Sequence, residues 1–149
     1  MQLKNHPNKV HEDIVVFSVK GRVNYYPQMT KGKVRVKGNE KEYESGVYNH
    51  YKKSKTKNDL YYPKSIIEFS NAGRTGKSKK IHPTQKPVDL LEYLIKTYTN
   101  DGETVLDNCM GSGSTGIACL NTNRKFIGIE LDEKYFEMAK NRIENHKED

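Results

Sequence analysis

The sequence predicts an α/β protein that contains part of a Rossmann-like fold together with an irregular, basic insertion. Between residues 81 and 149, amphipathic and β-branched segments alternate in the order helix, strand, helix, strand, helix. A strand, helix and second strand within about 30 residues are typical of a βαβ unit, whose two strands are parallel and adjacent. Residues 20–80 instead carry many glycines and lysines and only short apolar runs. The regular part of the fold is therefore expected after residue 80.

The composition narrows the classes of protein to which the chain can belong. It has 149 residues, of which 30% are charged and 34% hydrophobic. This length fits one domain with a modest core. No apolar run approaches the roughly 18 residues of a transmembrane helix, and the first residues lack a signal-peptide segment. Two cysteines without a Cys-x-x-Cys spacing indicate neither a disulfide framework nor a zinc site, so we expect a cytoplasmic protein.

Charge is unevenly distributed along the chain. The net charge is +7, but residues 1–80 carry 18 basic and 7 acidic residues, whereas residues 81–149 carry 8 basic and 12 acidic residues. Seven of the ten tyrosines also lie in residues 1–80. Basic side chains mixed with flat aromatic rings suit a nucleic-acid backbone and its bases. A solvated basic surface without a specific partner is the alternative.

The first 80 residues contain weaker signals for regular structure. Residues 11–19 include a short β-branched apolar run and predict a buried strand. Short strands are expected at 33–37 and 65–69, with a lysine-rich loop at 52–59.

After residue 80 the elements are well marked. Residues 88–98 carry an apolar stripe of helical period, and a turn at 100–102 ends that helix. A strand is expected at 104–107, a short helix from about 115 to 121, and a second strand at 125–130. Asp132 is expected to cap a last helix. The predicted buried face of that helix consists of Tyr135, Phe136, Ala139 and Ile143.

The loop between the two strands carries the strongest indication of a binding site. Residues 108–116 are rich in Gly and Ser and lead from a strand into a helix, where backbone N–H groups lack partners. Asp107 precedes the loop, and Glu130 ends the next strand, where an acidic residue can accept the ribose hydroxyls of an adenosine-type ligand. The loop lacks a P-loop ending, and Asp107 at its mouth would repel a pyrophosphate. A cationic ligand without phosphate, such as S-adenosylmethionine, fits better than a dinucleotide. A ligand-free connection is the alternative.

Three segments also resemble, in the same order, motifs of a known enzyme family. They are residues 81–87 with the helix that follows, residues 105–116, and residues 126–131. Together they resemble the C-terminal part of a permuted, beta-group DNA amino-methyltransferase, which uses S-adenosylmethionine to methylate adenine N6 or cytosine N4. The resemblance implies an S-adenosylmethionine-dependent methyltransferase form of the Rossmann-like fold, with double-stranded DNA as partner.

The resemblance also divides the chain and assigns residues to roles. It implies a core strand in residues 1–19, a target-recognition region in 20–80 and a βαβ segment that binds S-adenosylmethionine in 81–149. The expected cofactor-binding residues are Thr84, Lys86, Pro87, Asp107, Cys109, Gly111, Gly113, Ser114, Thr115, Glu130 and Leu131. The expected DNA-binding residues are Arg22, Lys31, Lys33, Arg35 and Lys37. Helix capping by Asp107 and a plain pre-helix turn at Lys86 and Pro87 are the alternatives.

One departure from the family pattern is large. The family's catalytic motif contains two adjacent prolines, whereas the five prolines of this chain, at 7, 27, 63, 83 and 87, are all separated. We therefore expect no catalytic residues here, no activity of the chain alone, and a role for an N-terminal half that carries the motif. His82 is expected to hold a turn, and Cys109 is not expected to be a nucleophile. The rival functions are a non-catalytic DNA-binding remnant with an empty cofactor pocket and, less favoured, a nucleotide-dependent oxidoreductase.

Overall fold

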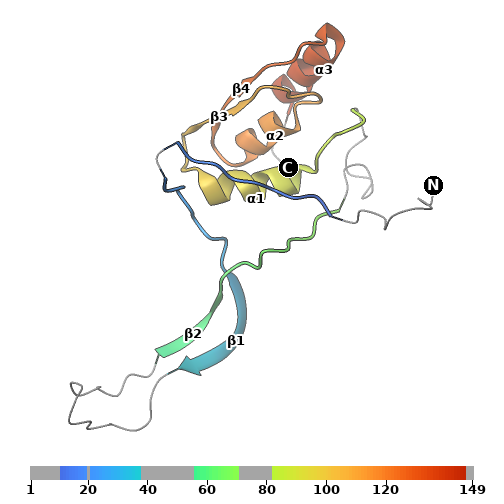
Figure 1. Ribbon diagram of the computed structural model, residues 1–149. Helices are drawn as coiled ribbons and strands as arrows, with labels where there is room; N and C mark the ends of the chain where they lie inside the picture. The colour runs from blue at the N-terminus through green and yellow to red at the C-terminus, as the bar shows by residue number, and fades with distance from the viewer. Residues whose placement is uncertain (1–10, 20, 38–55, 71–81, 147–149) are drawn as a thin grey trace, which may run out of the picture.

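The computed structural model describes residues 11–19, 21–37, 56–70 and 82–146. Two small sheets lie apart from each other. The antiparallel strands β1 (Thr30–Lys37) and β2 (Thr56–Tyr61) form one, and the parallel strands β3 (Thr104–Asp107) and β4 (Lys125–Gly128) form the other. The helices α1 (Val88–Tyr98), α2 (Ser114–Asn121) and α3 (Glu133–Glu144) lie next to the parallel pair, and β1 and β2 extend away from them (Figure 1).

The hydrophobic core lies between α1, α2 and the parallel strands. Ile95, Ala118 and Cys119 are buried at its centre. Four half-buried side chains pack against them, namely Val88, Leu91, Val105 and Phe126. The apolar stripe of α1 supplies its share of this contact because positions three and four residues apart lie on one helix face. The predicted helix over 88–98 is confirmed at both ends.

The β3–β4 pair confirms the predicted βαβ unit. The strands are parallel, with Val105 opposite Phe126 and Leu106 opposite Ile127. Side chains alternate between the two faces of a strand, so Val105 and Phe126 pack on the core while their neighbours face the other way. Leu106 and Ile127 are 61% and 53% exposed. Helices therefore cover one face of this parallel pair within the described residues.

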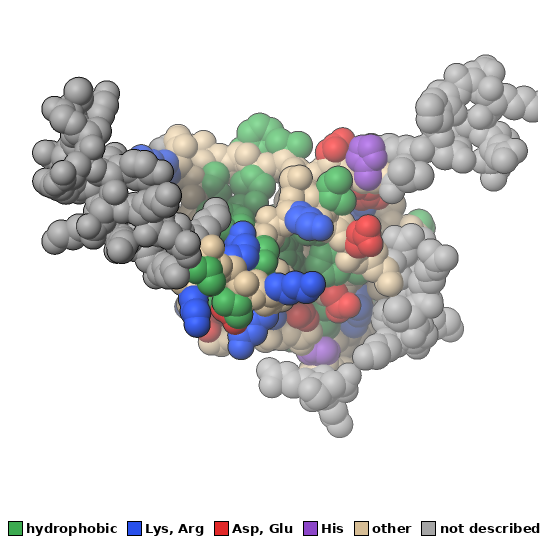
Figure 2. Space-filling model, turned by 90° about the horizontal axis from the view of Figure 1, so that it is seen from below, with side chains coloured by type: hydrophobic (Ala, Val, Ile, Leu, Met, Phe, Trp, Pro, Cys, Tyr) green, Lys and Arg blue, Asp and Glu red, His purple; other side chains and the backbone are tan. Residues whose placement is uncertain are grey.

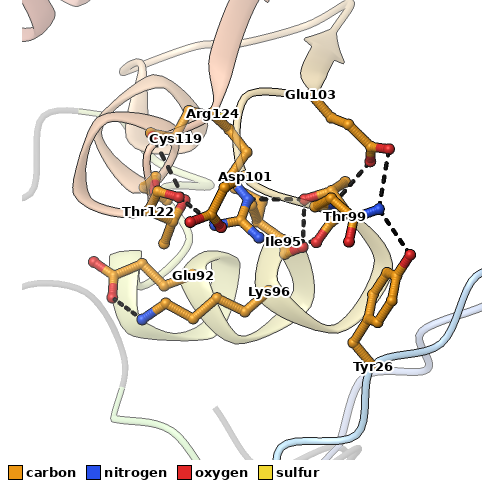
Figure 3. Close-up of polar contacts among 12 residues, drawn as sticks. Tyr26, Glu92, Ile95, Lys96, Thr99, Asp101, Glu103, Cys119, Thr122 and Arg124 are labelled. Carbon is orange, nitrogen blue, oxygen red and sulfur yellow. Dashed lines mark hydrogen bonds and ion pairs between the residues drawn. The ribbon is translucent and has the colours of Figure 1, made fainter.

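A buried arginine joins the end of α1 to the start of β4. The Arg124 side chain is 7% exposed and pairs with Asp101 in the turn after α1 (Figure 3). Its guanidinium also donates to Thr99, at the C-terminus of α1, through Nη2 to the carbonyl oxygen at 2.8 Å and through Nε to Oγ1 at 3.1 Å. These bonds fix the start of β4 beside the end of α1, and the candidate site lies at the opposite, carboxyl ends of β3 and β4.

The last helix begins where the sequence predicts. Asp132 accepts a hydrogen bond from the backbone N–H of Tyr135 at 3.0 Å and so caps α3. Ala139 is buried and Ile143 is half-buried, as expected. The prediction for Phe136 is wrong: this side chain is 36% exposed although it shares a helix face with Ala139 and Ile143, because it lies near the start of α3, one and two turns before the residues that pack on Gly113.

Three predictions in the first 80 residues need correction. Residues 11–19 form no strand, and Ile14, Val15 and Phe17 are exposed, because neither of the two described sheets pairs with the backbone of this segment. The predicted strand at 65–69 is also absent. The loop expected at 52–59 is a strand from residue 56 onward, and its residues 52–55 lie outside the described ranges.

The contacts of Tyr61 explain why β2 forms opposite β1. Its hydroxyl donates to the carbonyl oxygen of Lys33 at 2.9 Å, and its ring lies so close to Gly32 that a Cβ atom there would come within 2.7 Å of it. The insertion thus contains an antiparallel pair of strands, β1 and β2, whose register shifts between Lys31 and Arg35; we call this pair the hairpin. None of the three described helices is long and apolar enough to cross a membrane.

Candidate functional site

The glycine loop, which we define as residues 108–113, connects β3 to α2 in a conformation that requires glycine at two positions. Gly111 and Gly113 have φ angles of +52° and +72°, in the left-handed region that other residues rarely adopt. The N–H of Gly113 donates to the carbonyl oxygen of Met110 at 2.9 Å and closes the turn. The two glycines thus allow the loop to turn tightly at the carboxyl end of the sheet.

Asp107 ends β3 and organises both sides of this loop. Its Oδ1 accepts a hydrogen bond from the backbone N–H of Cys109 at 3.1 Å, and its Oδ2 accepts one from the Thr115 hydroxyl at 2.6 Å. Asp107 therefore fixes the start of the loop and the first turn of α2. Asp107 does not cap α2 in the usual way, because Gly113 stands at the N-cap without a side-chain cap and Asp107 bonds the hydroxyl of Thr115, not a backbone N–H of the helix. The carboxylate keeps further acceptor sites.

Glu130 follows β4 and reaches across to the glycine loop. Its Oε2 accepts a hydrogen bond from the Gly111 N–H at 2.8 Å, and its Oε1 accepts from the N–H groups of Leu131 and Asp132 at 3.0 and 3.1 Å. Hydrogen bonds from Asp132 and Gly111 hold the pKa of Glu130 below its ordinary value, because they stabilise the charged form. Glu130 is thus an anion at neutral pH.

The parallel strands bring these two carboxylates to one edge. The backbone bonds between β3 and β4 continue past the strands, because the Ile129 N–H donates to the Asp107 carbonyl oxygen and the Met110 N–H donates to the Ile129 carbonyl oxygen. Ligands of open α/β sheets bind at this edge. The structure thus assembles two acidic side chains and a glycine loop, as the sequence predicts. Their contact with a ligand stays a prediction.

Helix α3 packs closely against the loop. A Cβ atom on Gly113 would lie 3.0 Å from Ile143 and 3.1 Å from Ala139, and one on Gly116 would lie 2.5 Å from Ile143. From the same helix, Arg142 Nη1 donates to the carbonyl oxygen of Ser112 at 2.8 Å. Sequence reasoning missed Arg142. The available signal was a basic residue next to Ile143, on the side of α3 predicted to be buried.

The segment before α1 reaches the loop through His82. A Cβ atom on Gly111 would lie 3.5 Å from the His82 ring, and that ring packs edge-on against Tyr135 with 4.5 Å between centroids. His82 Nδ1 accepts a hydrogen bond from the Thr84 N–H at 3.3 Å. His82 therefore holds a turn, as the sequence predicts, and places Thr84 near the loop.

Several other expected cofactor-binding residues have different surroundings. Lys86 pairs with Glu12, and Pro87 stands at the N-cap of α1. Ser114 is 5% exposed and its hydroxyl lies 3.2 Å from Arg142, so it contacts α3. Cys109 is exposed, and Leu131 is 99% exposed next to Glu130. The structure thus brings Thr115, Gly111 and Gly113 together with the two carboxylates, whereas Lys86 is directed elsewhere.

Four of the five expected DNA-binding residues belong to β1, which extends away from the helices and the glycine loop (Figure 1). Lys31, Lys33 and Arg35 are exposed on β1, and Arg22 is exposed before it. The Arg35 guanidinium lies over the Tyr61 ring, 3.8 Å from its centroid. The backbone of Lys37 ends β1, and its side chain lies outside the described ranges. Seen from below, blue basic side chains gather with hydrophobic ones between them (Figure 2).

Among residues 11–19, 21–37, 56–70 and 82–146, no three His, Cys, Asp or Glu side chains group as a metal site would require. The hydrogen bonds of Asp107 and Glu130 to the glycine loop define the candidate site. A model of the N6/N4 methyltransferase family, described as DNA methylase, matches residues 1–141. The chain belongs to this DNA methylase family.

Individual relatives of this DNA methylase chain are considerably longer. It is 42% identical over 83 residues to the type II methyltransferase M.HpaI of Haemophilus parainfluenzae, covering 56% of this chain and 26% of that protein. It is 30% identical over 151 residues to the DNA adenine methyltransferase YhdJ of Escherichia coli K12, covering 97% of this chain and 48% of that protein. The chain thus spans less than half the length of these curated relatives.

Solved structures of similar proteins include the complex of M1.HpyAVI with SAM. That protein is 46% identical to the DNA methylase chain in the aligned part, with a TM-score of 0.48, covering 56% of this chain and 39% of the other.

Proposed function

We propose that this chain is the cofactor-binding and DNA-recognition portion of an S-adenosylmethionine-dependent DNA methyltransferase that acts on adenine N6 or cytosine N4. One observation carries the proposal: Asp107 ends β3, Glu130 follows the neighbouring parallel strand β4, and both are hydrogen-bonded to the same glycine loop. Membership in the DNA methylase family supports it.

The residues of this edge fit S-adenosylmethionine chemically. The cofactor carries a sulfonium and an ammonium group, two ribose hydroxyls and no phosphate. Two carboxylates attract the cationic groups and accept hydrogen bonds from the hydroxyls, whereas a phosphate would be repelled. Glu130 is charged at neutral pH because backbone N–H groups lower its pKa. When bound, the cofactor supplies an electrophilic methyl group.

The proposed contacts follow the order of the loop. We place Asp107, Gly111 and Gly113 at the methionine end, where the loop turns toward α2 and both glycines have left-handed φ angles. Both glycines are buried, Gly111 beside His82 and Gly113 beside α3. Glu130 accepts hydrogen bonds from the ribose hydroxyls. The exposed Leu131 side chain lies beside Glu130 and would pack on the adenine ring of the cofactor. The other proposed lining residues are Thr84, Lys86, Pro87, Cys109, Ser114 and Thr115. The main catalytic contribution of such a site is to orient the methyl group.

DNA recognition is assigned to the hairpin of β1 and β2. Lys31, Lys33 and Arg35 present exposed positive charge there, and Tyr61 offers an aromatic ring. In the complete enzyme the target base would leave the duplex and enter a pocket. The adjacent prolines expected of that pocket do not occur in this sequence. We therefore propose that a second polypeptide segment, carrying this motif, completes the catalytic site.

Isothermal titration of the 149-residue chain with S-adenosylmethionine tests the cofactor proposal. Asp107→Ala and Glu130→Ala should each weaken binding roughly 10- to 150-fold, the range for one lost charge-assisted hydrogen bond. Glu137→Gln, on the exposed side of α3, is the matched control and should bind as the natural chain does. If the folded Asp107→Ala and Glu130→Ala variants both bind S-adenosylmethionine as tightly as the natural chain does, the assignment is overturned. Binding of NAD in place of S-adenosylmethionine would favour an oxidoreductase.

A second candidate function is a DNA-binding remnant with an empty cofactor pocket. It is favoured by the contacts of Glu130, all three of which are to backbone groups of the chain itself. DNA binding by the chain without any S-adenosylmethionine binding would support it.

A tritiated-methyl transfer assay on DNA of mixed sequence tests the role of the missing motif. We expect no incorporation by the chain alone, and incorporation after addition of a polypeptide that carries an Asp-Pro-Pro-Tyr segment of the same family. Incorporation by the purified chain alone would contradict the proposal that catalysis needs this second segment.

A further inference from the structure

Arg142 is a partly buried cation whose recorded contacts all go to the segment that leads into α2. Its Nη1 atom lies 2.8 Å from the Ser112 carbonyl oxygen, 3.4 Å from the Ser112 hydroxyl and 3.2 Å from the Ser114 hydroxyl. The two hydroxyls are themselves 3.3 Å apart. One side chain thus connects α3 to both serines that flank Gly113.

The charge of Arg142 makes this arrangement unusual. No carboxylate within the described residues is recorded as its ion-pair partner, so the loop oxygens supply the polar surroundings that burial removes. A cation beside the N-terminus of α2 also opposes the dipole of that helix. The contacts to Ser112 and Ser114 must therefore offset the cost of burying the charge and the cost of opposing the dipole of α2. They can do so only while the glycine loop keeps its present conformation.

The neighbours of Arg142 on α3 fix where its guanidinium lies. Ala139 and Ile143 pack against Gly113, and Ile143 also packs against Gly116. These close approaches hold α3 against the loop and leave Arg142 little freedom to turn away. The opposite side of the loop is held by Glu130, which accepts the Gly111 N–H. The loop is therefore fastened from two directions, by an anion at Gly111 and a cation at Ser112.

We propose that Arg142 is a positioning residue, which acts on the cofactor site through the glycine loop without touching the ligand. It holds the Ser112 carbonyl oxygen away from the ligand side, so that Gly111 and Gly113 keep the conformation that the cofactor contacts. This inference rests on the proposed S-adenosylmethionine site and adds to it a residue on α3.

Three variants of the 149-residue chain separate positioning from general stability. Arg142→Gln removes the positive charge, whereas Arg142→Lys keeps it on a single ammonium nitrogen instead of a guanidinium. Lys140→Gln removes a positive charge from the exposed side of the same helix. The first measurement is amide hydrogen exchange at Gly111 and Gly113 without ligand, with the amides of α1 as internal reference. The second is the dissociation constant for S-adenosylmethionine.

We expect Arg142→Gln to raise loop exchange about tenfold relative to α1, and to raise the dissociation constant by a similar factor, as for one lost charged hydrogen bond. Arg142→Lys should restore part of both effects, and Lys140→Gln should change neither. Unchanged loop exchange in Arg142→Gln, or an equal rise in the loop and in α1, would overturn the proposal. If Arg142→Gln does not fold, Ser114→Ala, which removes one acceptor, provides the loop-exchange comparison alone, because Ser114 is itself a proposed lining residue of the cofactor site. Failure of the natural chain to bind S-adenosylmethionine would refute the proposed function, whereas loop exchange would still decide whether Arg142 holds the loop.

Discussion

The Glu130 carboxylate accepts a hydrogen bond from the backbone N–H of Gly111, with 2.8 Å between Oε2 and nitrogen. This bond joins the end of β4 to the loop that follows β3. It links the charge of one residue to the conformation of another 19 positions earlier. The stability and the ligand affinity of the loop are therefore expected to depend on the ionisation of Glu130.

The pH dependence of stability tests this link. A carboxyl whose pKa is lowered by folding stabilises the protein above its unfolded-state pKa, about 4.3 for Glu, and this contribution is lost as pH falls through the folded value. Glu130→Gln should therefore lower the free energy of unfolding at pH 7, and differ less from the natural chain at about pH 3. Urea unfolding at both pH values measures this. A gap of equal size at both pH values would contradict the role of Glu130, and Glu137→Gln serves as the control.

Close packing between Gly113 and α3 gives a second prediction. Gly113→Ala places a side chain at φ +72° and within 3.1 Å of both Ile143 and Ala139, whereas Gly102→Ala has a similar φ of +78° and open space. Backbone strain should cost each variant about 1 kcal/mol of unfolding free energy, and crowding should cost Gly113→Ala about 2 kcal/mol more. Urea denaturation measures both. Equal destabilisation of the two variants would show that α3 does not press on the loop.

The two cysteines should differ strongly in reactivity. Burial raises the pKa of the Cys119 thiol to about 11, so only about one thiol in a thousand is ionised at pH 8. Cys109 is exposed in the glycine loop. Iodoacetamide should alkylate Cys109 in the folded chain and Cys119 only after unfolding, and S-adenosylmethionine should slow the reaction of Cys109. Peptide mass spectrometry follows both sites, and equal labelling of the folded chain would refute the burial of Cys119.

Salt dependence tests the hairpin as a DNA-binding surface. With about four phosphate contacts, the logarithm of the association constant should fall with the logarithm of salt concentration at a slope of roughly −3.6. The variant Lys31→Ala/Lys33→Ala/Arg35→Ala should bind duplex DNA more weakly and with a slope near −1, because about three contacts are lost. Fluorescence anisotropy at several salt concentrations gives both quantities.

The control for this experiment removes equal charge elsewhere. Lys125→Ala/Lys134→Ala/Lys140→Ala alters three exposed lysines of the helical part. Its affinity should change little and its slope should stay close to that of the natural chain. Equal losses in the two triple variants would assign DNA binding to net charge rather than to the hairpin.

Much of the helical part could be predicted because its signals are local. The apolar stripe of residues 88–98 determines α1, and Asp132 marks the start of α3. The meeting of Asp107 and Glu130 also follows from the sequence, since adjacent parallel strands place their carboxyl ends at one edge. Each of these inferences needs only the order and period of nearby residues.

The features that the sequence did not reveal depend on distant partners. Strand β2 forms because Tyr61 lies against Gly32 and Lys33, about 28 positions earlier. The pattern of apolar residues near Tyr61 does not predict that pairing. Residues 11–19 have a strand-like composition but pair with no strand among the described residues. Arg142 meets Ser112 across 30 positions, so its contact with the loop became visible only in three dimensions.

The most direct test of the proposed cofactor site is a titration of the isotope-labelled chain with S-adenosylmethionine, observed through its backbone amide resonances. If Asp107, Glu130 and the glycine loop hold the cofactor, the amides of residues 107–115 and 130–132 should shift together, while those of β1 and β2 stay in place. Glu130→Ala should weaken these shifts at equal ligand concentration. Absence of any shift, or shifts confined to the hairpin, would contradict the account.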